Sequence, residues 1–177
     1  MATTIDLTEV MIIAALRTVL LGFVLPGTDI IRTEINRVPE PRTPTFIAMT
    51  PTARERLSAN VVTYDPIADT MLIRQSTQLT VALGIHGPNS ADNAQIISTV
   101  FRDDTAVLAF KALGLAIAPL YAGEPGQAAF LNAAQQDEWR WMIEIVLQVN
   151  PIVTVSQQFA DEVEIGLINV DARFPPV

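Results

Sequence analysis

The sequence predicts an α+β fold in which a mostly antiparallel β-sheet is packed by an N-terminal helix and by central helices. Two segments, residues 70–85 and 138–150, alternate apolar and polar side chains with the period of a β-strand. Residues 10–25 form a strongly apolar run of helical length. The order is one helix, several strands, helices and then strands, which lacks the regular strand and helix alternation of a doubly wound sheet.

The first helix is expected over residues 6–24. Thr4 or Asp6 can cap its N-terminus, and Pro26-Gly27 ends it. Because the apolar side chains go nearly all round this helix, we expect it to make contacts on more than one side.

The same segment is the one candidate for a membrane or export sequence. Its apolar part, residues 10–25, is shorter than a bilayer span and carries Arg17 in the middle. The upstream flank holds Asp6 and Glu9, whereas a signal peptide carries positive charge there. These features favour a buried or interface-packed helix.

Residues 27–66 are rich in proline and are expected to form short strands between ordered loops. β-like runs occur at 45–50 and 60–64. Residues 27–60 are a candidate for an arm that reaches a neighbouring molecule, because prolines lower the entropy cost of holding an extended shape. A packed surface loop is the alternative.

The long strand signal at 70–85 is interrupted on its apolar face by Gln75 and Thr77, which predicts a bulge or a hydrated patch near its middle. Helices are expected at 91–102, capped by Ser90, and at 104–113. The Asp103-Asp104 pair between them either caps the second of these helices or interrupts the helical segment before it.

A loop is expected to lead into the strand at 138–150. The odd-numbered side chains of this strand, led by Trp139 and Trp141, are expected to build the core against the helices. Its even-numbered face is mixed in character and is expected to meet a neighbouring subunit or a bordering strand. Further strands are expected at 152–155 and 163–172.

The composition limits the architecture and the chemistry. A chain of 177 residues that is 50% apolar can bury one sizeable core, so a single domain over residues 1–177 is expected. The formal net charge of −8 argues against binding to nucleic acid through clustered Lys and Arg. Because the chain has no cysteine, disulfides, thiolate nucleophiles and Cys-based zinc sites are excluded.

The sequence carries no catalytic signature, and we expect no enzyme activity, cofactor or metal. His86 is the only histidine and lies in a Gly-Ile-His-Gly-Pro segment, where a turn or surface histidine is the favoured interpretation. No G-x-S-x-G elbow, phosphate-binding glycine loop or EF-hand pattern occurs. A structural or interaction protein is therefore the leading class. A small hydrolase or ligand-binding domain that uses His86 and acidic residues is the alternative.

Three stretches in the C-terminal third carry a family resemblance: PLYAGEP at 119–125, LQVNP at 147–151, and VTVSQQFADEVEIGLINVDARFPP at 153–176. Through these three stretches, residues 115–177 resemble the tail terminator proteins of tailed-bacteriophage necks. The remainder of the chain is similar to them in layout, with an N-terminal helix, a proline-rich loop, a long strand and central helices. The resemblance implies a tail-terminator-like fold.

The resemblance also implies a function, a location and partners. Such a protein forms a homo-oligomeric ring, a hexamer, that caps the tail tube and any sheath, ends tail polymerisation and joins the tail to the head connector. It belongs to the virion and is assembled in the cytoplasm of the host bacterium. Its partners are itself, the tail tube protein, the sheath protein and the connector proteins. A head-completion or minor tail protein at another ring position is the alternative.

The acidic charge and the contact residues fit such a ring. Six copies of a chain with a net charge of −8 carry about −48, and a lumen of that sign lets DNA pass without specific binding. A ring needs contact surface on two sides of each protomer. The candidate interface residues lie on the first helix, in the loop before the Trp-bearing strand and on the even-numbered face of that strand: Arg17, Tyr121, Glu124, Arg140, Met142, Glu144 and Val146.

Overall fold

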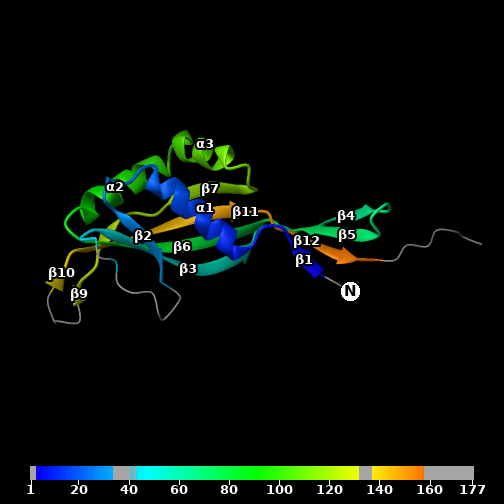
Figure 1. Ribbon diagram of the computed structural model, residues 1–177, viewed down its shortest axis with the longest axis horizontal. Helices are drawn as coiled ribbons and strands as arrows, with labels where there is room; N and C mark the ends of the chain where they lie inside the picture. The colour runs from blue at the N-terminus through cyan, green and yellow to red at the C-terminus, as the bar shows by residue number, and fades with distance from the viewer. Residues whose placement is uncertain (1–2, 34–40, 42, 132–136, 158–177) are drawn as a thin grey trace, which may run out of the picture.

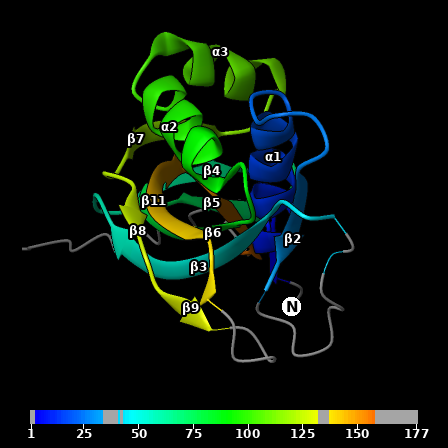
Figure 2. The same ribbon diagram turned by 90° about the vertical axis from the view of Figure 1, so that its left-hand side faces the viewer.

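The computed structural model describes residues 3–33, 41, 43–131 and 137–157, and it confirms the α+β class. Three helices cover one face of a six-stranded sheet (Figures 1 and 2). The helices are α1 (Glu9–Leu21), α2 (Ser90–Val100) and α3 (Asp104–Ala112). In spatial order the sheet contains β2 (Asp29–Arg32), β3 (Phe46–Arg56), β6 (Thr77–His86), β11 (Arg140–Val149) and β7 (Ile117–Ala122), and β8 (Gly126–Gln127) also pairs with β11. β2 runs parallel to β3, and the other pairs are antiparallel.

A second sheet extends from the helix-covered body along the long axis of the molecule (Figure 1). We call it the small sheet. Its four antiparallel strands are, in spatial order, β1 (Thr3–Ile5), β12 (Ile152–Ser156), β5 (Thr70–Arg74) and β4 (Val61–Asp65). A two-stranded ribbon of β9 (Phe130–Leu131) and β10 (Asp137–Glu138) lies at the opposite end of the molecule (Figure 1).

The predicted long strand at 70–85 is two strands, and this corrects the expectation of a single one. β5 ends at Arg74 and lies in the small sheet, whereas β6 begins at Thr77 and lies in the six-stranded sheet. A matching break separates β11 from β12, and the Gln75 N–H donates to the Pro151 carbonyl at 3.2 Å across the two breaks. The irregularity expected at Gln75 is therefore a change of sheet.

The core lies between the helices and one face of the six-stranded sheet. The sheet contributes the odd-numbered, fully buried side chains of β6 and β11: Leu79, Val81, Leu83, Ile85, Ile143, Ile145, Leu147 and Val149. Helix α1 adds Ile12, Leu16 and Leu20 to the same buried cluster. Burying each such aliphatic side chain contributes about 1.5–3 kcal/mol, so this layer holds the helices on the sheet. The prediction of a core on the odd-numbered face of β11 is confirmed from Ile143 onward.

Helix α1 begins later than predicted. The cap is Thr8, whose Oγ1 accepts from the Met11 N–H at 3.3 Å, and not Thr4 or Asp6. Thr4 lies in β1, and the Asp6 carboxylate accepts from the Ile152 N–H at 2.7 Å, which holds β1 against β12. The helix buries one face, and the apolar side chains Val10, Met11 and Leu21 remain exposed. Among the described residues, no helix is long and apolar enough to cross a membrane.

The other two helices match their predicted ranges closely. Asp103 caps α3, because its carboxylate accepts from the Thr105 N–H at 2.9 Å. Ser90 is the first residue of α2 and not its cap, and the preceding Asn89 takes the cap position without a side-chain hydrogen bond.

The proline-rich segment does not form an arm in its described part. β2 and β3 both lie in the six-stranded sheet, and β3 continues to Arg56, beyond the predicted end at residue 50. A register shift between Pro51, which pairs with Val81, and Ala53, which pairs with Thr80, leaves Thr52 as the extra residue of a bulge, and the strand continues beyond it. The segment predicted as a loop before residue 138 contains β7, β8 and β9. The strand predicted at 163–172 lies outside the described residues.

Candidate protein interaction surface

The six-stranded sheet has a second face, which none of the helices in the described part of the chain covers (Figure 2). We call it the open face. Cross-strand pairing places three rows of side chains on it, each contributed by β3, β6 and β11 in turn. The rows are Phe46, His86 and Arg140; then Ala48, Gly84 and Met142; then Thr50, Ala82 and Glu144.

Small residues in the second and third rows produce a shallow hollow in the open face. Two depressions share Ala82 and Met142 and so adjoin one another. The first also contains Phe46 and Gly84 and is largely apolar. The second is bordered by the carboxylates of Glu124 and Glu144. An apolar centre with a charged border is typical of a surface that binds another protein.

His86 lies at one end of this hollow, and its interpretation as a turn or surface histidine is wrong. It is the last residue of β6 and is only 7% exposed. Its ring stacks on Phe46 with 4.5 Å between centroids and 5° between planes. The pairing of β6 with strands on both sides buries the ring, because Phe46 and Arg140 are its direct cross-strand neighbours.

The structure brings most of the predicted interface residues to the open face. Arg140 and Met142 are half-buried there, and Glu144 is exposed. Tyr121 of β7 pairs with Val146 and is half-exposed, whereas Val146 is 2% exposed and is not available at the surface.

The remaining two predicted residues occupy different positions. Glu124 borders the hollow and forms an ion pair with Arg102 at 2.7 Å. The Arg102 guanidinium also donates to the Ala122 carbonyl at 3.0 and 3.1 Å, which fixes the chain after β7 against the end of α2. Arg17 is on α1, away from the hollow, where its Nε donates to the Ile30 carbonyl at 3.0 Å.

Sequence reasoning missed the β3 and β6 contributions to this surface. Phe46, Ala82 and Gly84 lie in segments that the sequence predicts as strands. The register that aligns these segments with β11, however, depends on the tertiary structure. Trp139 was also misplaced. It precedes β11 and is 64% exposed, because β6 ends at His86 and leaves no strand beside it. Trp141 packs against the core as predicted.

The described residues offer little for catalysis. They contain no group of three or more side chains that could hold a metal ion. The pKa of Asp103 is lowered by hydrogen bonds from Thr105, and the pKa of Asp104 is raised by the neighbouring Asp103 carboxylate. These two exposed residues are the cap and first turn of α3, so their shifts belong to helix capping.

Comparison with known proteins identifies the family. A family model described as phage neck terminator protein matches residues 11–171, and a search of curated proteins finds no match. The match extends far beyond residues 115–177, which carried the resemblance, and it includes the helices and the open face. Proteins of this family are structural components of the bacteriophage neck. With nearly its whole length matched, this chain belongs to the phage neck terminator protein family.

Proposed function

We propose that this protein forms a ring, a hexamer, that caps the tail tube, ends tail polymerisation and joins the tail to the head connector. In this proposal, residues 1–177 act as one terminator domain without enzymatic activity. The observation that carries the proposal is the open face of the six-stranded sheet. Helices bury the opposite face, whereas the open face presents an apolar hollow bordered by charged side chains.

The open face is assigned to the tail tube protein. Its centre, formed by Phe46, Ala48 and Met142, can bury apolar surface of a partner. Glu124 and Glu144 at its border can select a partner surface that carries basic side chains. A protein bound to the tube end in this way stops tube polymerisation, because its own exposed surface offers no binding site for the next tube subunit.

The charge of the chain supports a position around the DNA channel. With 19 acidic and 11 basic side chains, the protein lacks the basic excess that holds DNA by its phosphates. A ring of such chains repels DNA weakly along its lumen and therefore lets the genome pass.

The assignment of the open face is tested with Met142→Glu, which places a charge in the hollow. The matched control is Gln148→Glu, which introduces the same group on the same face of β11 but outside the hollow. Met142→Glu is expected to weaken binding to the purified tail tube protein by at least about 100-fold, because a buried unpaired carboxylate costs several kcal/mol. Gln148→Glu is expected to bind like the wild type.

Binding is measured by biolayer interferometry on tube ends, and function by complementation of a phage that lacks the gene. A Met142→Glu protein that binds tubes and restores infectivity would refute the assignment. Binding to head connector protein but not to tube protein would favour the alternative, a head-completion or minor tail protein at another ring position.

A further inference from the structure

Within the described residues, the small sheet has no core of its own. None of the residues in β1, β4, β5 and β12 is fully buried. None of these strands packs extensively against a helix or against the six-stranded sheet within the described chain, and Figure 1 shows the sheet extending beyond the helices. In a stable fold, the apolar face of a sheet is buried against another element.

One face of the small sheet is largely apolar. Cross-strand pairing aligns Ile5, Val153, Ile73 and Val62 in one row, and Thr3, Val155, Met71 and Tyr64 in the next. No charged side chain lies in these two rows, and Ile5, Val62 and Tyr64 are 46%, 44% and 54% exposed. We call this set the apolar face. The opposite face of the sheet is mixed, with Thr4, Thr154, Leu72 and Thr63 in register.

The size of the apolar face limits what can cover it. Four strands spaced about 4.8 Å apart, with three residues in β1 and five in each of the others at roughly 3.3 Å per residue, span on the order of 300 Å². A stable protein interface buries about 800 Å² on each partner. The covering molecule must therefore contact more of this chain than the apolar face alone.

A second exposed apolar anchor lies at the other end of the molecule. Trp139 is 64% exposed and belongs to the connection between β10 and β11, beside the ribbon that Figure 1 shows opposite the small sheet. Its carbonyl accepts from the Gly87 N–H at 3.0 Å, so its backbone is held in place. Tryptophan is the residue most enriched at the energetic centres of protein interfaces.

The apolar face suits a second copy of this chain. Two molecules of net charge −8 repel each other, and they approach with least cost where neither presents a charge. The two rows of the apolar face meet that condition. Contact between different ends of identical molecules is heterologous, and such contacts generate a ring when the rotation between copies closes.

We propose that the apolar face of the small sheet packs against the Trp139 end of a second copy, so that each copy uses both ends in a head-to-tail contact. This inference rests on the ring in the proposed function and assigns the surface through which the copies associate. The open face of the six-stranded sheet remains available for the tail tube protein.

The test uses two contact variants and one matched control in the full chain. Val62→Glu charges the apolar face, and Trp139→Ser removes the anchor at the other end. Thr63→Glu is the control, because Thr63 is the next residue of β4 and points to the opposite side of the small sheet. Molecular mass is measured by analytical ultracentrifugation, with tail tube protein absent and present.

The wild type and Thr63→Glu are expected to form rings, whereas Val62→Glu and Trp139→Ser are expected to stay monomeric. A mixture of Val62→Glu with Trp139→Ser is expected to form dimers, because the intact apolar face of one variant can bind the intact Trp139 of the other. An isologous contact, in which one patch meets its own copy, gives no such rescue. The dimer in the mixture therefore tests the head-to-tail arrangement directly.

Folding is controlled by far-ultraviolet circular dichroism and by a milder variant, Val62→Thr. Threonine keeps the shape and strand preference of valine, and it is expected to raise the dissociation constant between copies about tenfold. Rings of Val62→Glu at wild-type concentrations would overturn this inference and leave the proposed ring intact. Loss of tube binding by Val62→Glu with unchanged self-association would also overturn it. A wild type that stays monomeric even with tube protein would instead refute the proposed function.

Discussion

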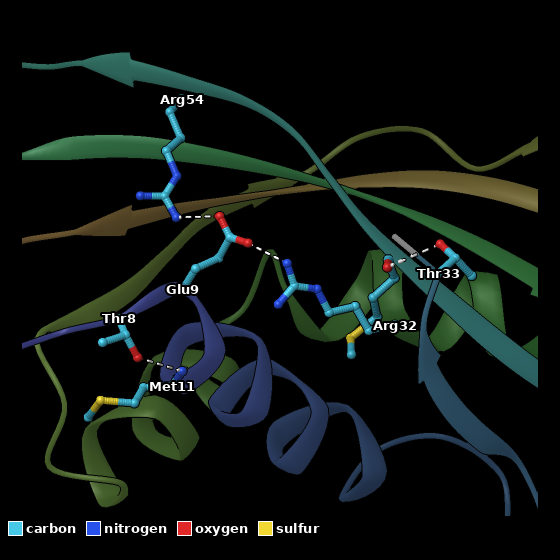
Figure 3. A network of polar contacts seen from close by, with 7 residues as sticks. Thr8, Glu9, Met11, Arg32, Thr33 and Arg54 are labelled. Atoms are coloured by element: carbon cyan, nitrogen blue, oxygen red, sulfur yellow. Dashed lines mark hydrogen bonds and ion pairs between the residues drawn. The ribbon is translucent and has the colours of Figure 1, made fainter. Parts of the chain in front are cut away.

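The Glu9 carboxylate accepts a hydrogen bond from Arg54 of β3 at 2.9 Å, and its second oxygen accepts from Arg32 of β2 (Figure 3). Glu9 is in the first turn of α1, so one carboxylate joins the helix to two strands of the six-stranded sheet. The negative charge also lies at the helix N-terminus, where the helix dipole favours it. This network fixes the entry of α1 at the edge of the sheet.

Replacing Glu9 by Gln is expected to lower the free energy of unfolding by about 1 kcal/mol. The value is small because all three side chains are partly exposed and water screens their charges. Urea denaturation measures the change. A double-mutant cycle with Arg54→Met is expected to give a coupling energy of roughly 0.5 kcal/mol. Strict additivity of the two substitutions would contradict the network.

Asn93 joins α2 to the chain that follows α1, and its removal is expected to cost more. Its Oδ1 accepts from the Leu25 N–H at 2.9 Å, its Nδ2 donates to Thr28 Oγ1 at 3.1 Å, and the residue is fully buried. Asn93→Leu leaves the Leu25 N–H without its acceptor, which costs about 1–3 kcal/mol. Thermal unfolding measures this loss. Gln95→Leu, on the exposed side of the same helix, is the control and is expected to change stability by less than about 0.5 kcal/mol.

Gly87 cannot be replaced without moving the backbone. Its φ is +93°, and a Cβ atom built on it would lie 2.0 Å from the Pro44 carbonyl oxygen. Gly87→Ala is therefore expected to destabilise the fold by about 3 kcal/mol or more. Gly114→Ala measures the cost of the backbone conformation alone, because Gly114 has φ +66° but nothing within 4 Å of its Cβ position. Its expected cost is about 1 kcal/mol. Equal melting temperatures for the two variants would show that the backbone at Pro44 moves away from the added methyl group without loss of stability.

The sequence was most informative where local patterns decide the structure. The α+β class and the three helices follow from periodicity, which is a local property, whereas the caps predicted for the first two helices were wrong. The buried odd-numbered face of β11 follows from alternation in the same way. The candidate surface was found in part, because even-numbered positions of one strand share a face regardless of what lies beside them.

The errors have a common physical cause. Alternation continues unbroken through Trp139, yet burial ends where the neighbouring strand ends, at His86. The small sheet was not predicted at all, since β5 and β6 read as one strand and only their partners show that they separate at Gln75. His86 was misjudged because its stacking partner, Phe46, is distant in sequence. The whole fold determines which strands become neighbours, and local patterns in a single sequence do not predict it.

The acidic pair at the start of α3 is expected to titrate as a coupled unit. The pKa of Asp103 lies below its ordinary value of 3.8, because its carboxylate accepts hydrogen bonds from Thr105. The pKa of Asp104 lies above 3.8, because Asp103 favours its protonated form. Stability from Asp103 is therefore present above pH 3.8 and is lost as the pH falls through its folded pKa.

Asp103→Asn keeps an N-cap acceptor but removes the charge, so the pKa of Asp104 is expected to fall toward 3.8. Carbon-13 NMR of the side-chain carboxyl measures that pKa, and an unchanged value would show that Asp103 is not the cause of the shift.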